Sequence, residues 1–568
     1  MLAVEAAFEE HIASWLVEHG GYRRVKVGSA GGEPPEFDVQ AGVDTADLFE
    51  FLGATQAADW ERLVDSAYGG DPNQAQSGFV QRLASELDKR GTVDVLRHGV
   101  VDRNIKIRLA YFKPAQGLTP ELAQRYEANV LSVVRQLPFE PDTSRTVDLG
   151  LFVNGIPVAT AELKNPLTGQ TVENAIAQYR TDRPHNNRTM GRLGMVHFAV
   201  DPASAAMTTR LAGTRTRFLP FNRGHNLGAG NPPNPDGHRT AYLWERVWSR
   251  DAWMDILGRF IHVEKPSRGS RARPEVIFPR FHQWDAVRRL EADAKERGAG
   301  HNYLVQHSAG SGKSNSIAWL AHRLSSLHTD DSAQVFNKVV VITDRIVLDR
   351  QLQDTISQFE HALGVVERID ENSAQLAAAL AGEQARIIVT TLQKFPLIFD
   401  KIESLPERNY AVIVDEAHSS QTGEAANELR RALGSAHPEI DTDMEAGEVE
   451  ALLSAAVAAR GRQPNLWFFA FTATPKGRTL ELFGEVGENG RYEPFHLYPM
   501  RQAIEEGFIE DVLGGYLTYN QYFHLEKAIL DDPEYDTGKA RTALARFVTL
   551  YPDNLAQKAE IIVEHYRT

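Results

Sequence analysis

The sequence predicts an α/β protein in which an N-terminal domain containing a β-hairpin precedes a domain with a parallel β-sheet. Its second half alternates short runs of Val, Ile and Phe with helical stretches, as do parallel strands buried on both faces. The first half holds two stretches of alternating apolar residues around Asn-Gly, which is typical of a β-hairpin. The 568 residues exceed what one hydrophobic core supports and suggest roughly three to four domain-sized units.

The composition predicts a cytoplasmic protein that does not enter a membrane. Hydrophobic residues make up 42% and charged residues 24%, as in ordinary globular proteins. No apolar run approaches the roughly 20 residues that span a bilayer, and the N-terminus is acidic where a secretory signal would be basic. The absence of cysteine excludes disulfides and thiolate metal sites. A net charge of −15 argues against a passive DNA-coating protein but leaves local basic patches open.

The domain boundaries are predicted from changes in composition. Residues 221–238 are rich in Gly, Asn and Pro and are expected to be a loop. Residues 263–275 have the character of an interdomain linker. The predicted organisation is an N-terminal domain over 1–262, this linker, a parallel-sheet domain over 276–496, and a connection or the start of another domain over 497–568.

The expected parallel strands are short runs rich in Val, Ile and Phe, predicted at residues 303–307, 338–343, 385–390, 410–416 and 466–472.

Two charged runs are interpreted as solvated surface or linker. Basic residues cluster from Lys265 to Arg280, before the second of the predicted domains, and acidic residues are concentrated over 439–450.

The stretch HSAGSGKS, residues 307–314, follows the first predicted strand and precedes a helical stretch. This is the pattern of a phosphate-binding loop, in which glycines let backbone N–H groups approach phosphates at a helix N-terminus. Lys313 is expected to reach the β- and γ-phosphates, and the Ser314 hydroxyl to bind Mg²⁺. His307 stands where the usual pattern has its first glycine, which leaves the geometry of the turn open.

A second element, Asp415-Glu416-Ala417-His418, ends another predicted strand, where a parallel sheet presents its ligand residues. The order and context resemble superfamily 2 helicases of the DEAH spelling, which implies a RecA-like fold and ATP as the ligand. By this resemblance Asp415 holds Mg²⁺ and Glu416 polarises the attacking water, whereas His418 has either a motif role or a structural one. The residues expected to contact the nucleotide are Gln283, at the adenine, and Gly310, Ser311, Gly312, Lys313, Ser314 and Asp415.

Further parts of the chain resemble other motifs of the same superfamily. Residues 343–345 and 390–395 occupy the places of strand-tracking motifs, and residues 472–474 the place of the motif that couples hydrolysis to movement. The second domain is therefore expected to be an ATPase of this class.

The N-terminal half contains a predicted hairpin over residues 146–166. The apolar residues of the two strands lie on one face together only if the residue numbers of each cross-strand pair add up to an even number. Leu149 opposite Ala161 is such a pair. A three-residue loop centred on Gly155 is expected to produce that register, which a two-residue turn would not. The same register places Asp148 opposite Glu162.

Lys164 lies two residues beyond Glu162 on the same polar face of the hairpin. An Asp, a Glu and a Lys together suit metal-dependent phosphodiester hydrolysis, with Asp148 and Glu162 holding Mg²⁺ and Lys164 orienting the nucleophile. The spacing resembles the PD-(D/E)xK nuclease fold. Taken by itself, the pattern also fits a surface salt bridge.

The wider sequence resembles the endonuclease (R) subunit of type I restriction systems, through the hairpin, ENAIAQYR, FLPFNRGHNLGAGNP, YLWERVW and, after the ATPase motifs, YPMRQAIEEGFIEDVL. The family's Gln-x-x-x-Tyr element maps onto Gln178, but its fifth position is Asp182, with Tyr179 beside the glutamine. Glu9 is either a further acid near the metal or, as expected here, part of a solvated helix face.

The resemblance implies a subunit that works with methyltransferase and specificity subunits, moves duplex DNA using ATP, and cuts it with Mg²⁺. The motifs of a second RecA-like domain are not found before Thr568, so the isolated chain is expected to bind ATP, hydrolyse it poorly and not translocate. Two alternatives remain open: a translocase or remodeller without nuclease activity, and a non-catalytic module that binds ATP or DNA.

Overall fold

The computed structural model describes most of the chain up to residue 511. The described residues are 2–25, 37–115, 119–141, 143–264, 274–297, 301–343, 352–353, 355–357, 365–369, 373–391, 407–415 and 465–511. Residues 1–506 form one compact unit.

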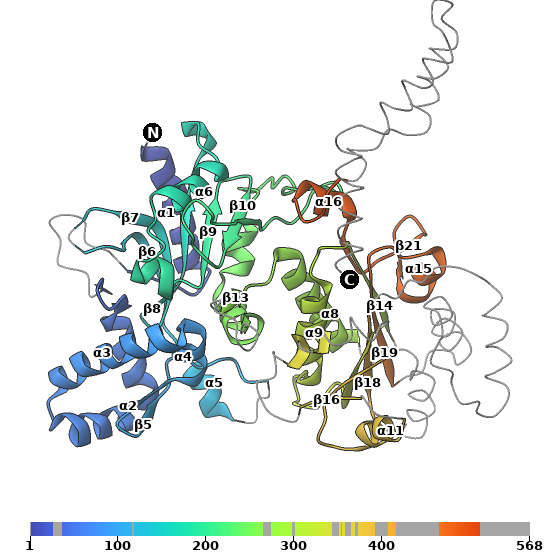
Figure 1. Ribbon diagram of the computed structural model, residues 1–568, viewed down its shortest axis with the longest axis horizontal. Helices are drawn as coiled ribbons and strands as arrows, with labels where there is room; N and C mark the ends of the chain where they lie inside the picture. The colour runs from blue at the N-terminus through green and yellow to red at the C-terminus, as the bar shows by residue number, and fades with distance from the viewer. Residues whose placement is uncertain are drawn as a thin grey trace, which may run out of the picture. The chain divides into compact units, whose positions relative to one another are not determined.

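A seven-stranded mixed sheet organises the N-terminal half (Figure 1). Its order is β1-β6-β7-β8-β9-β10-β11, with parallel pairs at β1–β6 and β8–β9 and antiparallel pairs elsewhere. Helices α1 and α6 pack against it, α1 on β6 and α6 on β8 and β9. The strands are β1 (Arg23–Val25), β6 (Leu131–Pro138), β7 (Thr146–Val153), β8 (Ile156–Leu163), β9 (Val196–Val200), β10 (Ala205–Thr208) and β11 (Leu219–Pro220).

Helices and two short hairpins complete this half. The helices are α1 (Leu2–Glu18), α2 (Thr45–Tyr68), α3 (Pro72–Arg90), α4 (Thr92–His98), α5 (Pro120–Glu127), α6 (Val172–Thr181) and α7 (Arg250–Asp255), with single turns at η1 (Pro166–Thr168), η2 (Thr189–Leu193), η3 (Leu243–Val247) and η4 (Ile256–Phe260). The hairpins pair β2 (Phe37–Asp38) with β3 (Val43–Asp44), and β4 (Val100–Asp102) with β5 (Ile105–Ile107). Residues 221–238 form neither helix nor strand, as predicted.

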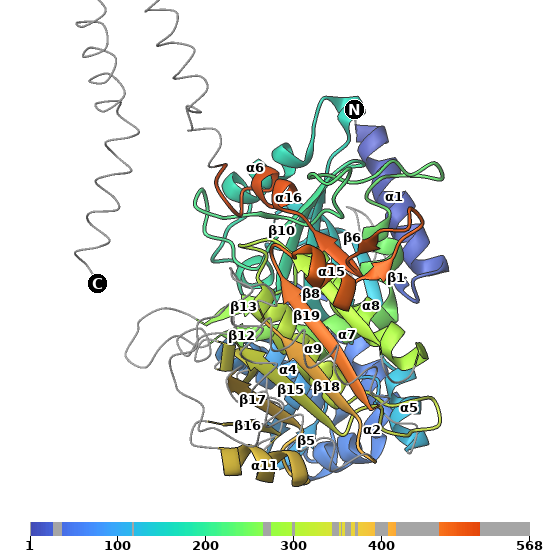
Figure 2. The same cartoon turned by 90° about the vertical axis from the view of Figure 1, so that its right-hand side faces the viewer.

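The second sheet is wholly parallel and has the order β16-β17-β15-β18-β19-β14-β22. Figure 2 shows β15, β18 and β19 side by side. The five predicted strands are confirmed, and the short edge strands β16 and β22 are additional. The strands are β14 (Asn302–His307), β15 (Lys338–Thr343), β16 (Val366–Arg368), β17 (Ile387–Thr391), β18 (Tyr410–Val414), β19 (Leu466–Thr472) and β22 (His496–Tyr498).

Alternate residues of these strands enter two separate cores, because successive side chains point to opposite faces of a sheet. Val339 and Val341 of β15 pack in the core that includes α8 and α9, whereas Val340 and Ile342 pack with α11 and α15. The sheet therefore has helices on both faces. The helices are α8 (Phe281–Arg297), α9 (Lys313–Ser325), α11 (Ser373–Ala381), α15 (Gly477–Phe483) and α16 (Met500–Glu505), and β20 (Glu485–Val486) pairs with β21 (Tyr492–Glu493).

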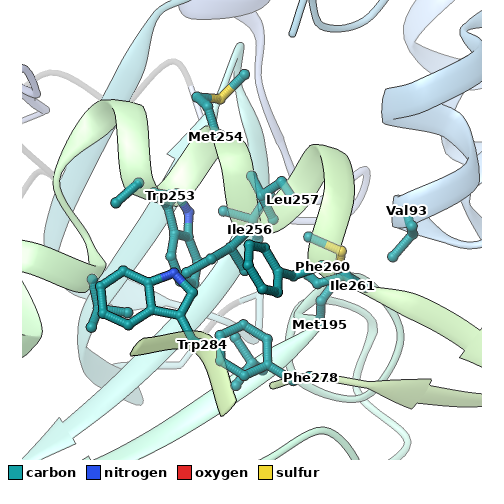
Figure 3. Close-up of a cluster of buried hydrophobic side chains, with 14 of the residues drawn as sticks. Val93, Met195, Trp253, Met254, Ile256, Leu257, Phe260, Ile261, Phe278 and Trp284 are labelled. Carbon is teal, nitrogen blue, oxygen red and sulfur yellow. The ribbon is translucent and has the colours of Figure 1, made fainter. Parts of the chain in front are cut away.

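Large aromatic side chains fill the core next to α8. Figure 3 shows Trp253, Phe278 and Trp284 gathered there with Phe260. The ring centroids of Trp253 and Phe278 lie 6.0 Å apart, and all four side chains are buried. The predicted linker begins and ends in strands, since β12 (His262–Glu264) pairs with β13 (Glu275–Ile277), and residues 265–273 lie outside the described part. Across the described residues, no helix combines the length and apolar character needed to cross a membrane.

Candidate active sites on the two sheets

The turn between β7 and β8 consists of two residues, Asn154 and Gly155, with φ of 51° and 79°. Two positive φ angles are the signature of the type I′ turn that joins tight hairpins. Val153 accordingly pairs with Ile156. A Cβ at Gly155 would lie 2.1 Å from the carbonyl oxygen of Asp44, so this position requires glycine on steric grounds as well. The predicted three-residue loop is therefore wrong.

A β-bulge restores the register that the alternation of apolar residues requires. Val158 has no partner on β7, and below it Leu149 pairs with Ala161, as predicted. One extra residue on one strand shifts the pairing by one position and moves each following side chain to the correct face. The turn and the bulge together bring Asp148 opposite Glu162.

Both carboxylates are held by specific contacts. Asp148 Oδ2 accepts a hydrogen bond from the Leu163 N–H at 2.7 Å. Glu162 is fully buried, and its Oε1 accepts from Arg183 Nε at 2.5 Å. Glu162 Oε2 is buried and has no hydrogen-bond partner among the described residues. Burial and then the Asp148 charge raise the pKa of Glu162 to about 8, although Arg183 opposes this rise.

The set is not the surface salt bridge that the sequence left open as an alternative. Lys164 is 8% exposed and Arg183 is 7% exposed, so both cations adjoin the buried Glu162 and the half-buried Asp148 with little contact to water. Lys164 Nζ donates to the Leu163 carbonyl at 3.1 Å. No group of three or more His, Asp or Glu side chains arranged to hold a metal occurs within the described ranges. Two carboxylates suit Mg²⁺, which keeps several of its waters and binds proteins through one or two carboxylates.

Two further residues of this site come from α6 and the residues after it. Sequence reasoning did not identify Arg183, which follows the C-terminal end of α6 and whose guanidinium lies 5.3 Å from the centre of the Phe139 ring. It named Tyr179 only as the neighbour of Gln178. Tyr179 is buried, and its hydroxyl lies 2.8 Å from Thr160 Oγ1 on the Glu162 face of β8. The spacing of four residues between Tyr179 and Arg183 was the available signal. Gln178 is half-buried on the same helix, and among the described residues no side-chain hydrogen bond joins it to Asp148 or Glu162.

Glu9 is part of this network and not of a solvated helix face, which corrects that expectation. It is 4% exposed and accepts hydrogen bonds from Arg135 Nε at 2.6 Å and Gln136 Nε2 at 2.8 Å. The Gln136 amide also lies 3.5 Å from Asp148 Oδ1. Burial raises the pKa of Glu9, and the Asp148 charge adds to that rise. Gln136 thus joins the first helix to the carboxylate pair.

The loop between β14 and α9 has the backbone of a phosphate-binding loop. Gly310 and Gly312 have φ of 72° and 77°, and α9 begins directly at Lys313. Such left-handed positions are accessible to glycine without strain. His307 is the last residue of β14 and does not adopt positive φ, so the turn forms without a glycine there. Arg280 NH1 donates to the Gly310 carbonyl at 2.7 Å.

Gln283 holds this loop directly. Its Nε2 donates to the carbonyls of Gly312 at 2.9 Å and Ser311 at 3.2 Å, and its Oε1 accepts from the Arg280 N–H. The amide is 3% exposed. Contact with an adenine would therefore require Gln283 to release part of the loop.

Buried hydroxyl groups without hydrogen-bond partners occur in the loop that follows β14, at Ser308 Oγ and Ser311 Oγ. Two more, Thr343 Oγ1 and Thr390 Oγ1, lie at the ends of β15 and β17, which β18 and β19 separate from β14. Buried hydroxyl groups are normally paired, so the two serines of the loop suit a polar ligand such as a nucleotide.

The other predicted ATPase residues fall partly inside the described ranges. Asp415 directly follows β18, and its N–H donates to the Ile342 carbonyl at 3.0 Å. Thr472 ends β19, which lies between β18 and β14. Ser314 stands in the first turn of α9 and is half-buried. Glu416, His418, residues 344–345 and residues 392–395 lie outside the described residues.

The two sheets, the carboxylate pair on the first and the phosphate-binding loop on the second together define a nuclease-type region followed by a RecA-like ATPase region. The model for the N terminus of type I restriction enzyme R proteins matches residues 87–216, and the SWI2/SNF2 ATPase model matches residues 282–438. The chain belongs to the family of type I restriction enzyme endonuclease subunits.

Three curated relatives illustrate this membership. The HindI endonuclease subunit of Haemophilus influenzae is 27% identical over 64% of this chain and 32% of its own length. The putative MjaVIIIP endonuclease subunit of Methanocaldococcus jannaschii is 22% identical over 89% of this chain and 50% of its own. The C-terminal part of the putative MpnIIP endonuclease subunit of Mycoplasma pneumoniae is 30% identical over 32% of this chain and 87% of its own. This chain spans a third to a half of the first two.

Proposed function

We propose that the chain is the endonuclease and motor subunit of a type I restriction system. It moves duplex DNA using ATP and cleaves unmodified foreign DNA with Mg²⁺, together with methyltransferase and specificity subunits. The observation that carries the nuclease assignment is the buried Glu162 carboxylate beside Asp148, with one oxygen held by Arg183 and the other unpartnered. Family membership supports the rest.

In the proposed nuclease site, Asp148 and Glu162 hold Mg²⁺ between β7 and β8. The ion supplies a water of lowered pKa and neutralises charge on the phosphate under attack. Arg183 fixes the Glu162 carboxylate through Oε1, which leaves Oε2 for the metal. Lys164 orients the nucleophile or stabilises the pentacovalent phosphorus, and Gln178 assists from α6.

Glu9 acts on Asp148 in this proposal and not on the metal. A glutamine amide can donate to two acceptors, and the Gln136 amide faces both Glu9 and Asp148. The Thr146 hydroxyl donates to the Gln136 carbonyl oxygen at 2.7 Å, which sets the orientation of the amide. Glu9, Gln136 and Thr146 therefore limit the rotation of the Asp148 side chain.

In the proposed ATP site, loop N–H groups and Lys313 bind the phosphates. Ser314 and Asp415 hold the accompanying Mg²⁺, which screens charge on the phosphates. Glu416 orients the attacking water. Gln283 contacts the adenine once its amide leaves a loop carbonyl.

We also propose the domain division 1–262, 263–275, 276–496 and 497–568, with duplex DNA as the substrate of the first and third segments. Limited proteolysis with mass spectrometry tests it. Cleavage concentrated within 263–275 supports this division, and first cuts inside either sheet contradict it.

Plasmid cleavage by the chain with cognate methyltransferase and specificity subunits, ATP and Mg²⁺ tests the function. We expect Glu162→Gln to abolish cleavage while DNA-stimulated ATP turnover persists, and Lys313→Ala to abolish both. The exposed Glu173→Gln on α6 is the matched control and should cleave normally. Calorimetry with Mg²⁺ in the absence of nucleotide gives a second measurement, in which binding by the wild type should weaken in Glu162→Gln.

A translocase without nuclease activity is the competing function. It predicts equal Mg²⁺ binding and equal plasmid integrity for wild type and Glu162→Gln, with ATP turnover unchanged. The buried position of Glu162, with an oxygen left unpaired, favours the nuclease, because burying a carboxylate costs several kcal/mol that a bound cation offsets.

A further inference from the structure

A carboxylate and two histidines form a continuous line of side chains that ends at the phosphate loop. His307 Nε2 lies 2.8 Å from His496 Nδ1, and His496 Nε2 lies 3.4 Å from Asp285 Oδ2. The three residues come from β14, β22 and α8, and all are buried. They are called the histidine bridge below. At its outer end, Arg246 NH2 contacts Asp285 Oδ1 at 2.7 Å.

The outer carboxylate of the bridge is charged. Although burial alone would raise it, the His496 hydrogen bond and nearby charges lower the pKa of Asp285 to about 2, so this carboxylate only accepts. His496 stands between Asp285 and His307 and presents one ring nitrogen to each, so that one of the two imidazoles donates to the other.

The inner end of the bridge faces the loop. His307 Nδ1 is buried and has no hydrogen-bond partner among the described residues. Lys313 Nζ donates to the His307 carbonyl at 3.5 Å, which connects the backbone of this histidine to the lysine of the loop. The next N–H, that of Ser308, donates to the Tyr498 carbonyl at 2.9 Å. The start of the loop is therefore attached to β22 through both side chain and backbone.

A third histidine holds the other side of the loop. His282 Nε2 lies 3.0 Å from the Ser311 carbonyl, and its ring stacks on Tyr498 with centroids 3.7 Å apart. The loop is thus held at both ends by imidazoles that stand on α8 and β22. Other charged groups near the bridge are Arg289, 3.8 Å from Asp285, and Arg280, which contacts the Gly310 carbonyl.

We propose that Asp285, His496 and His307 are positioning residues for ATP, which fix the start of the phosphate loop by attaching its first residue to β22 and α8. Arg246 orients the outer carboxylate and so connects η3 of the N-terminal half to the nucleotide site. The proposal rests on the ATP site proposed above and adds to it residues outside the loop motif. It also explains why a histidine serves at the first loop position.

The affinity of the full chain for a fluorescent ATP analogue with Mg²⁺ tests the bridge. We expect Asp285→Asn, which keeps the shape but removes the charge that His496 contacts, to weaken binding about tenfold or more. His307→Gln should weaken it to a similar degree. In the double variant the losses should not multiply, because both substitutions interrupt the same line of contacts.

Asp293→Asn is the matched control. Asp293 is a partly buried aspartate of the same helix that pairs with Arg297 at 2.9 Å, away from the loop, and its substitution should leave affinity unchanged. Melting temperatures identify any variant that fails to fold, and His496→Gln then replaces it.

Affinities equal to wild type in Asp285→Asn and His307→Gln would overturn the bridge, as would losses that multiply in the double variant. Binding by the wild type no tighter than by Lys313→Ala would overturn the ATP site itself, and the bridge with it. The two failures are distinct, because only the second removes binding from the wild-type chain.

Discussion

His197 is a buried histidine whose protonation should weaken the N-terminal sheet in mildly acidic solution. It lies in β9 and is 1% exposed, with Nδ1 2.7 Å from Thr160 Oγ1 and its ring tilted against Tyr179. Burial lowers the pKa of His197 from 6.5 to about 3, although a hydrogen bond to the Met190 backbone opposes the change. The imidazole is therefore neutral in the folded protein throughout the physiological range.

The sign and size of the effect follow from this difference in pKa. Because the unfolded chain takes up the proton first as pH falls below 6.5, the free energy of unfolding is highest above that pH. It decreases as pH falls toward 3. From RT ln(1 + 10^(pKa−pH)) with the unfolded pKa, the loss is below about 0.1 kcal/mol at pH 7.5 and about 1.4 kcal/mol at pH 5.5, so the difference is also about 1.4 kcal/mol.

Urea denaturation of wild type and His197→Gln at pH 7.5 and 5.5 measures this difference. The total pH dependence of the wild type is not diagnostic, because Glu162, with its pKa raised to about 8, stabilises the fold as pH falls from 8 toward 4.5. The comparison between variants removes that contribution. His98→Gln is the control, since that side chain is 61% exposed. Equal pH dependence in wild type and His197→Gln would refute the reasoning.

Three further substitutions test the local geometry. Gly155→Ala places a Cβ 2.1 Å from the Asp44 carbonyl at φ of 79°, so we expect a loss of more than about 2 kcal/mol in urea denaturation. Gly312→Ala places a Cβ 2.5 Å from Gln283 Nε2 at φ of 77°, and nucleotide titration should show at least about tenfold weaker binding without loss of the nuclease fold by circular dichroism. Arg323→Met leaves two partly buried carboxylates unpaired and should cost about 3 kcal/mol in the same urea assay, whereas unchanged stability would show that the ion pairs contribute little.

The strands could be predicted because their signal is local. The run 338–343 has four successive apolar residues between a lysine and a threonine, and β15 has these bounds in the structure. The short edge strands β16 and β22 were not predicted, because three residues carry too little periodicity to distinguish a strand from a loop. The bulge at Val158 was also missed. Alternation of side chains fixed the final register but did not tell whether the loop or a bulge supplied the extra residue.

The candidate nuclease site was predicted where its residues lie on one hairpin. Asp148 and Glu162 follow from the pairing of two strands, which alternation alone determines. Arg183 comes from beyond α6, and Glu9 comes from α1, more than a hundred residues before the hairpin. Such contacts depend on how helices pack on the sheet, and a single sequence contains no periodic signal for them.

The unpaired polar atoms distinguish the two proposed sites from the rest of the core. A buried polar atom without a partner costs about 1–3 kcal/mol, and the described residues include indole N–H groups of this kind, such as those of Trp253 and Trp284, which stand among apolar side chains (Figure 3). Glu162 Oε2, by contrast, adjoins a second carboxylate, and Ser308 Oγ and Ser311 Oγ lie in one loop. A bound ion at the first place or a nucleotide at the second would relieve this cost, so binding of either ligand should raise the stability of its own sheet.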